Sequence, residues 1–338
     1  MENSGHKFDA YRGVTVLVLG ASGFIGRWVA RELCKQGAHL HLVVRDEKIT
    51  RRMFAQYEID GEILEMDLRE PSSSVDLFWK VRPSITFNLA GYGVDPSETD
   101  EKTTWQINSD LPKSICSAIA KTTDPLWAGQ DLIHVGSALE YGTAQGDLSE
   151  DSIANPTTSY GQSKLSGTRQ LARCCEENRL KGVTARLFTV FGPGEHDGRL
   201  LPSLLEAADS QNSVPLTSGV QERDFTYVED VAEGLLRLGL TTDAKPGEAL
   251  NLATGKLTSV RAFAEKSAGI LGIPEDKMDF GAKPMRAEEM KHAPVSIERL
   301  HELTSWVPPT TVEEGIGRTL RFLQRLPGYR NDAQLAFS

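Results

Sequence analysis

The chain has 338 residues, of which 39% are hydrophobic and 25% are charged, and its formal net charge is −10 at pH 7. A chain of this length and balance forms a globular fold with a sizeable core. Its acidity argues against nucleic acid and anionic membranes as partners. No apolar run approaches the roughly 20 residues that cross a bilayer.

The cysteine pattern and the N-terminal segment point to a reducing compartment. The four cysteines fit neither a metal site nor a disulfide framework, and they are Cys34, Cys116, Cys174 and Cys175. The segment before residue 13 is polar and shows no secretory leader. We therefore expect a cytoplasmic protein that holds no metal.

Short apolar runs alternate with helical stretches along the first 190 or so residues. We predict strands at 13–20, 40–44, 63–66, 85–90, 132–135 and 183–188, and helices at 25–36, 74–81, 103–121 and 159–178. A strand–helix alternation of this kind predicts a parallel sheet with crossover helices. The predicted fold class is therefore α/β, a doubly wound parallel sheet of the Rossmann type.

A glycine-rich turn joins the first strand to the first helix. Its residues are Gly20, Ala21, Ser22, Gly23, Phe24, Ile25 and Gly26. Glycines permit a tight turn, let backbone N–H groups approach a pyrophosphate, and allow close packing of helix and strand. The helix N-terminus adds partial positive charge. The turn predicts a dinucleotide site, although the spacing is G-x-x-G-x-x-G and not G-x-G-x-x-G.

The end of the second strand bears on the choice of nicotinamide cofactor. An acidic residue there typically holds the ribose of NAD, whereas an arginine accommodates the 2′-phosphate of NADP. Here Arg45 comes first, and Asp46 follows as a residue that suits the ribose instead. We expect NADP(H), with NAD(H) as the alternative. Asp67 is expected to accept from the adenine amine, and the pocket to be lined by Leu68, Leu89, Ala90 and Leu187.

Tyr160 and Lys164 form a Tyr-x-x-x-Lys pair. A spacing of four residues places both side chains on one helix face. A free phenol has a pKa near ~10, and a neighbouring ammonium lowers it. Ser137, just past the fifth strand, is placed to hydrogen bond the reacting oxygen of a substrate. We predict Ser137, Tyr160 and Lys164 as the catalytic residues, with Tyr160 and Lys164 also contacting the cofactor.

Prolines and glycines interrupt the chain after Phe191. We expect a dinucleotide-binding domain over 13–191, with its sheet completed by about 223–255. A smaller α/β substrate lobe is expected from 192–222 and 256–326, followed by a tail at 327–338.

These motifs resemble the extended short-chain dehydrogenase/reductase family, in its branch of nucleotide-sugar epimerases, dehydratases and reductases. Besides the glycine turn and the Tyr–Lys helix, the resemblance rests on the segments 136–142, 191–194, 223–231 and 305–315. It implies a nucleotide-diphosphate sugar as substrate, with Arg223 and Arg286 as diphosphate ligands. Thr189 stands where many relatives carry a substrate-contacting Asn. Relatives often dimerise through the helices that correspond to 103–121 and 159–178.

The resemblance argues against a dehydratase, and the end of the second strand, at 42–46, and the segment 136–142 favour net reduction. Dehydratases of this family carry an Asp-Glu pair after the catalytic hydroxyl, where this chain has Ala138 and Leu139. The segment 136–142 is similar to that of GDP-4-keto-6-deoxymannose reductases. We therefore expect an NADPH-dependent reductase of a keto-deoxysugar, acting at C4. The alternatives are a 4-epimerase with tightly held NAD, a reductase of a non-nucleotide ketone and a non-catalytic relative.

Overall fold

The computed structural model describes residues 8–69, 71–95, 97–144, 146–210, 212–285 and 293–326. Seven parallel strands form its large sheet, in the order β10-β6-β5-β4-β1-β2-β3. The strands are β1 (Thr15–Leu19), β2 (His39–Val44), β3 (Glu62–Glu65), β4 (Ile85–Asn88), β5 (Leu132–Ser137), β6 (Gly182–Leu187) and β10 (Glu248–Leu252). The predicted Rossmann-type sheet is thus confirmed, and its strand order reverses between β1 and β4.

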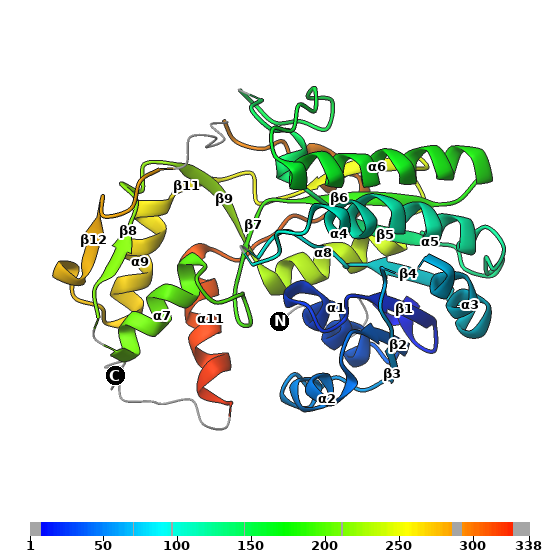
Figure 1. Ribbon diagram of the computed structural model, residues 1–338, viewed down its shortest axis with the longest axis horizontal. Helices are drawn as coiled ribbons and strands as arrows, with labels where there is room; N and C mark the ends of the chain where they lie inside the picture. Colours follow the sequence, from blue (N-terminus) through cyan, green and yellow to red (C-terminus); the bar gives the residue numbers. More distant parts are fainter. Residues whose placement is uncertain are drawn as a thin grey trace.

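Helices cover both faces of this sheet (Figure 1). They are α1 (Phe24–Lys35), α2 (Glu47–Gln56), α3 (Pro71–Val81), α4 (Glu101–Trp105), α5 (Leu111–Ile119), α6 (Ser159–Asn178) and α8 (Val228–Leu240). On one face α1 packs against α8, and on the other α5 packs against α3 and α6.

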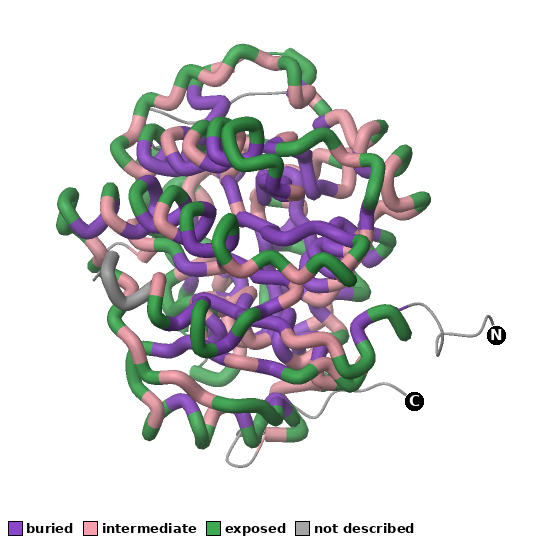
Figure 2. The backbone as a smooth tube through the Cα atoms, turned by 90° about the vertical axis from the view of Figure 1, so that its right-hand side faces the viewer, coloured by how far each residue is buried: buried purple, intermediate pink, exposed green. Residues whose placement is uncertain are grey.

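The core follows from the two-residue period of the strands. Along β1, Val16 and Val18 join the hydrophobic cluster on the α1 and α8 face. Leu17 and Leu19 join the cluster on the α5 face. Because successive side chains of a strand point to opposite faces, a strand buried on both sides reads as one apolar run. Figure 2 shows the buried positions gathered inside the molecule and the exposed ones around them.

The remaining elements build a smaller region beside the sheet (Figure 1). Its strands pair in two small sheets, β11-β9-β7 and β12-β8. The strands are β7 (Thr189–Phe191), β8 (Val214–Leu216), β9 (Glu222–Tyr227), β11 (Leu257–Ser259) and β12 (Met278–Phe280), and the helices are α7 (Leu200–Ser210), α9 (Val260–Leu271) and α11 (Val312–Gln324). Helix α10 (Glu298–Thr304) packs against β10 and α8 of the large sheet. Short turns of helix lie at η1 (Asp9–Tyr11), η3 (Ala138–Glu140) and η4 (Glu275–Lys277). Within the described ranges, no helix has both the length and the apolar character needed to cross a membrane.

The structure departs from the sequence prediction in two helices. The predicted helix 103–121 is not one regular α-helix, because a π-helical segment, η2 (Gln106–Asp110), separates α4 from α5. Helix α2 was not predicted. Its sequence buries only Thr50 and Phe54, so it lacks a clear apolar stripe. Its start signal is Asp46, whose side chain caps the helix by accepting from the Ile49 N–H.

Candidate active site

The glycine turn lies where the strand order of the sheet reverses. Gly20 ends β1 with a φ of +73°, and a Cβ atom there would stand 2.8 Å from the backbone nitrogen of Ala90, which follows β4. A Cβ atom on Gly26 would stand 2.1 Å from the backbone oxygen of Gly20. These two glycines therefore allow β1, α1 and the end of β4 to meet closely. In open α/β sheets, ligands bind at such a reversal point.

The N-terminus of α1 faces the same reversal point. Gly23 is its exposed N-cap residue, and no side chain of the described residues caps the helix. The helix begins with Phe24 and Ile25, and Ser22 is half-buried beside them. Uncapped N–H groups at a helix N-terminus suit the negative charge of a phosphate. The turn thus fits the pyrophosphate of a dinucleotide.

Arg45 and Asp46 have different roles at the end of β2. Asp46 is the N-cap of α2, with a distance of 2.9 Å between its Oδ1 and the Ile49 nitrogen. Arg45 is exposed, and in the described part of the chain no hydrogen bond or ion pair holds its guanidinium. Arg51 is engaged, because its Nε donates to Glu47 at 2.8 Å. Arg45 is thus exposed at this strand end and acts electrostatically on Asp67, while the carboxylate of Asp46 already caps a helix.

Asp67 follows β3 and is held by Arg69. The Nε of Arg69 lies 2.9 Å from each carboxylate oxygen, and the Arg69 N–H donates to Oδ1. These hydrogen bonds lower the pKa of Asp67. The predicted contact with an adenine amine would share the carboxylate with Arg69. Leu68 and Leu89 are half-buried, whereas Ala90 and Leu187 are buried at the ends of β4 and β6.

Ser137, Tyr160 and Lys164 come together beyond the carboxyl end of β5. Ser137 is the last residue of that strand, and Tyr160 and Lys164 lie one turn apart on α6. The helix begins at this point because the Thr158 hydroxyl caps it by accepting from the Gly161 N–H at 3.0 Å. The Ser137 hydroxyl lies close enough to the Tyr160 phenol to lower its pKa. Lys164 is buried, and its Nζ donates to the Val135 backbone oxygen.

Burial acts in opposite directions on the two titratable groups of this set. It raises the pKa of Tyr160, and the carboxylate of Glu140 raises it further, while the neighbouring Ser137 hydroxyl lowers it. Burial lowers the pKa of Lys164 to about 8, although Glu140 opposes that change. Desolvation disfavours the charged form of both groups. At neutral pH the Tyr160 phenol therefore keeps its proton, and the Lys164 side chain beside it is close to its own pKa. A protonated phenol in this setting suits proton donation to a substrate.

Asn108 was not predicted as part of the site. It lies in η2 and is buried. Its Nδ2 donates to the Tyr92 backbone oxygen at 2.8 Å and to the Ser163 hydroxyl at 3.0 Å, and its Oδ1 accepts from the Tyr92 N–H. Asn108 thus ties the loop after β4 to α6. A polar residue inside a helical stretch is too common to single Asn108 out from the sequence.

Two more charged residues face Tyr160, and sequence analysis missed both. Glu98 accepts from the Gly93 N–H at 2.8 Å and raises the pKa of Tyr160, while Arg199 lowers it. Arg199 lies 3.5 Å from Glu195, whose buried Oε2 has no hydrogen-bond partner among the described residues. Burial raises the pKa of Glu195 to about 7.

The predicted substrate residues lie in the smaller region. Thr189 begins β7 and is half-buried. Arg223 lies in β9, which pairs with β7, and its Nη1 donates to the Glu222 backbone oxygen at 2.6 Å. Arg286 lies outside the described residues. The pairing of β7 with β9 brings Thr189 opposite Phe225, two residues from Arg223.

A family model described as the NAD dependent epimerase/dehydratase family matches residues 16–253. The chain belongs to this family. It is an NAD(P)-dependent enzyme of the extended short-chain dehydrogenase/reductase type, and its relatives act on nucleotide sugars.

Three relatives illustrate the range of the family. The dTDP-6-deoxy-L-talose 4-dehydrogenase (NAD(P)(+)) of Kitasatospora kifunensis is 26% identical, over 89% of this chain and 93% of that protein. The UDP-glucose 4-epimerase of Mycolicibacterium smegmatis is 25% identical, over 94% of this chain and 99% of the relative. The solved structure of MoeE5 in complex with UDP-glucose and NAD has a TM-score of 0.78 at 25% identity, and the match covers 92% of this chain and 98% of MoeE5.

Proposed function

We propose that the protein is an NADPH-dependent ketoreductase that reduces a keto group, at C4, of a nucleotide-diphosphate deoxysugar. The observation that carries the choice of NADPH is the arrangement at the end of β2. Arg45 is exposed, while Asp46 caps α2. A guanidinium pairs with a 2′-phosphate, whereas a carboxylate that faces the cofactor would repel it.

The proposed reaction uses Ser137, Tyr160 and Lys164 in different roles. Bound NADPH would supply the hydride for the carbonyl carbon of the sugar. Tyr160 donates its proton to the carbonyl oxygen, and Ser137 hydrogen bonds the same oxygen. Lys164, held by the Val135 backbone oxygen, places positive charge beside the phenol and binds the nicotinamide ribose. Protonation of the oxygen as the hydride arrives avoids an alkoxide in a buried site.

The proposed substrate class rests on relatives and on the smaller region. A dTDP-4-dehydro-6-deoxy-D-allose reductase from Streptomyces bikiniensis is 27% identical over 94% of this chain. We propose that Arg223 binds the diphosphate of such a substrate, that Arg286 contributes to the same contact, and that Thr189 contacts the sugar. Guanidinium groups suit phosphate oxygens because they donate in a planar fork.

A 4-epimerase with tightly held NAD is the second candidate. The epimerase relative and the NAD-containing structure named above favour it. In an epimerase, bound NAD would take the hydride from the sugar and return it after the keto intermediate rotates, while the same three residues would handle the proton and orient the sugar oxygen. The two functions differ in what happens to the cofactor, which a reductase releases and an epimerase retains.

We also propose that the protein is a cytoplasmic homodimer that associates through α5 and α6. The exposed positions of α6 are polar, and they include Gln162, Arg169, Arg173, Glu176 and Glu177. A dimer formed through this face would therefore have a polar interface. Light scattering coupled to gel filtration, repeated at high salt, tests for a dimer that salt weakens.

The experiment that tests the proposed function is an analysis of the cofactor. Mass spectrometry of the denatured protein identifies any nicotinamide dinucleotide that it retains, and fluorescence titrations measure binding of NADPH and NADH. The reductase proposal expects micromolar binding of NADPH and no retained NAD. Stoichiometric NAD with weak binding of NADPH would replace the proposal with the epimerase.

A further inference from the structure

Glu140 is a fully buried carboxylate that adjoins Ser137, one of the proposed catalytic residues. It ends the short helix η3, three residues after Ser137, and has no exposed surface. Its Oε1 accepts from the Ser137 N–H at 2.9 Å, while the Ser137 hydroxyl accepts from the Leu139 N–H. The two residues thus form a capping box, which fixes the chain where β5 ends.

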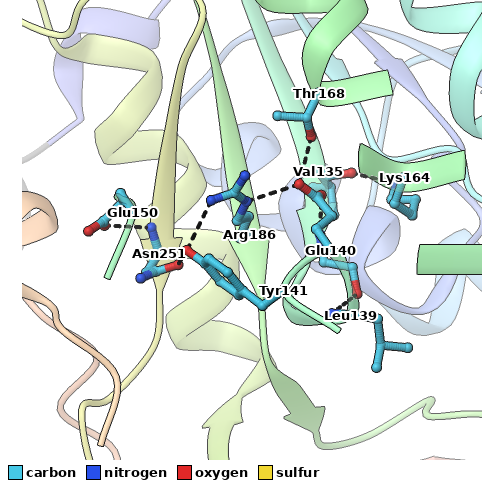
Figure 3. A network of polar contacts seen from close by, with 10 residues as sticks. Val135, Leu139, Glu140, Tyr141, Glu150, Lys164, Thr168, Arg186 and Asn251 are labelled. Atoms are coloured by element: carbon cyan, nitrogen blue, oxygen red, sulfur yellow. Dashed lines mark hydrogen bonds and ion pairs between the residues drawn. The ribbon is translucent and has the colours of Figure 1, made fainter. Parts of the chain in front are cut away.

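The second oxygen of Glu140 reaches two other elements (Figure 3). It accepts from Nε of Arg186, on β6, at 2.9 Å and from the hydroxyl of Thr168, on α6, at 3.0 Å. Thr168 comes one turn after Lys164 on the same helix. A single carboxylate therefore joins the end of β5, β6 and the helix of the Tyr–Lys pair.

Arg186 makes the buried charge of Glu140 tolerable. Its Nη1 donates to the Tyr141 hydroxyl at 3.0 Å, and its guanidinium carbon lies 4.6 Å from the centre of the Tyr141 ring. The Tyr141 hydroxyl in turn donates to Asn251, on β10, at 2.7 Å. Buried ion pairs often contribute less to stability than apolar residues of similar volume. Stability alone thus gives no reason for a charge at this place.

We propose that Glu140 is a positioning residue for Ser137, Tyr160 and Lys164. Its hydrogen bonds hold Ser137 against the helix that carries the other two, and its negative charge keeps both of those side chains protonated at neutral pH. This inference rests on the proposed reductase function, in which Tyr160 donates a proton.

The charge acts on Lys164 first. Burial alone would favour the neutral amine, and Glu140 raises the pKa of Lys164 against this effect. His134, on β5, also faces Lys164, but burial holds the pKa of His134 well below its usual range, so it stays neutral. Val135 contributes an uncharged backbone oxygen. Glu140 is therefore the negative charge that keeps Lys164 an ammonium.

The charge acts on Tyr160 in the same sense. Glu140 raises the pKa of Tyr160, and so does Glu98, while Arg199 and the Ser137 hydroxyl lower it. A nearby negative charge disfavours the phenolate. Removal of the charge on Glu140 therefore lowers the pH at which each of the two groups loses its proton.

The Glu140→Gln variant tests the charge. The readout is the midpoint of the pH titration of the Lys164 Cε resonance, measured by NMR on protein labelled with ¹³C at lysine. We expect this midpoint to fall by about one pH unit. The matched control is Thr168→Val, which removes a neutral hydrogen bond to the same carboxylate and should leave the midpoint in place. An unchanged midpoint in Glu140→Gln, or an equal fall in the control, would overturn the electrostatic part.

The Glu140→Asp variant tests whether Glu140 positions the catalytic residues. It also serves as the test of the proposal if the Glu140→Gln variant does not fold. Aspartate keeps the charge but is one methylene shorter, so it cannot bridge Ser137, Arg186 and Thr168 together. We expect kcat to fall about tenfold or more while KM and the Lys164 midpoint stay near those of the unmodified protein. An unchanged kcat, or a parallel loss of NADPH binding, would overturn the positioning role.

The two readouts also separate this inference from the proposed function. The pH titration of Lys164 needs no substrate and reports on Glu140 whatever the reaction is. If the unmodified protein reduces no keto-sugar but its Lys164 midpoint still depends on Glu140, the reductase proposal fails and the electrostatic role stands. If the unmodified protein reduces the sugar and both Glu140 variants behave like it, the proposed role of Glu140 fails and the reductase proposal stands.

Discussion

The Nζ atom of Lys164 donates a hydrogen bond of 2.5 Å to the backbone oxygen of Val135, two residues before Ser137. An ammonium has three N–H donors, so two remain for the cofactor ribose and for the surroundings of Tyr160. The strand that ends at Ser137 therefore also fixes the amine that supports Tyr160. This arrangement links the sheet to the proposed proton transfer.

The rate of reduction should depend on the proton of Lys164. Burial lowers the pKa of this side chain to about 8, so the ammonium is present below that pH and is lost above it. We expect kcat/KM for NADPH-dependent reduction to be level near neutral pH and to fall about tenfold per pH unit above about 8. A profile that stays level far above this pH would show that Lys164 acts without its charge.

Tyr160→Phe should stop the chemistry and spare the cofactor site. The change removes the proton donor while the ring remains. We expect kcat to fall by roughly 10²–10⁴, with NADPH binding within a few-fold of the unmodified protein. A rate near that of the unmodified protein would assign proton donation to another group, and the buried Glu195 would be the first to examine.

Gly26→Ala should damage the cofactor turn. The added Cβ would stand 2.1 Å from the Gly20 backbone oxygen, so the turn or α1 must shift. We expect loss of dinucleotide binding and a fall in unfolding free energy of roughly 1–3 kcal/mol from overpacking. The measurements are NADPH titration and denaturant unfolding.

Gly269→Ala is the matched control for that substitution. Gly269 is an exposed position in α9, and a Cβ there meets no atom within 4 Å. This variant should bind NADPH normally and gain roughly 0.4–1 kcal/mol of stability, because alanine restricts the unfolded chain. A Gly26→Ala protein that binds NADPH as well as Gly269→Ala does would place the cofactor elsewhere.

Arg45→Ala should change the cofactor preference. Loss of a charge-assisted pair with the 2′-phosphate costs roughly 1.5–3 kcal/mol, a factor of about 10–100 in the NADPH dissociation constant. Binding of NADH, which has no such phosphate, should change little. Arg51→Ala is the control, since Arg51 already pairs with Glu47. Equal effects on the binding of NADPH and NADH would exclude Arg45 as the residue that binds the 2′-phosphate.

The sequence predicted the parts of the fold that depend on regular patterns. Apolar runs alternating with helices predicted the parallel sheet, and the Tyr160–Lys164 spacing predicted that both residues lie on one face of a helix. Helix α2 escaped prediction because it buries few apolar residues. The π-helical segment around Asn108 was not predicted. It is accompanied by hydrogen bonds between Asn108 and Tyr92, which are 16 residues apart, and a local sequence pattern does not contain such contacts.

The sequence pattern did not predict the buried charges of the site, for a similar reason. Glu140 stands among residues that the motif analysis used, yet its sequence context gives no sign that the carboxylate is buried. Its partner Arg186 is 46 positions away. Burial and pairing of polar groups depend on which strands become neighbours, and that is a property of the whole fold.

The most direct test of the central claim follows the hydride. The protein is incubated with NADPH that carries deuterium at the transferred position and with a dTDP-4-keto-6-deoxyhexose, and the sugar product is analysed by mass spectrometry and NMR. The account predicts oxidation of one NADPH per sugar reduced, with the deuterium on C4 of the product. Interconversion of nucleotide hexoses without added cofactor, with no deuterium in the sugar, would contradict it and establish the epimerase.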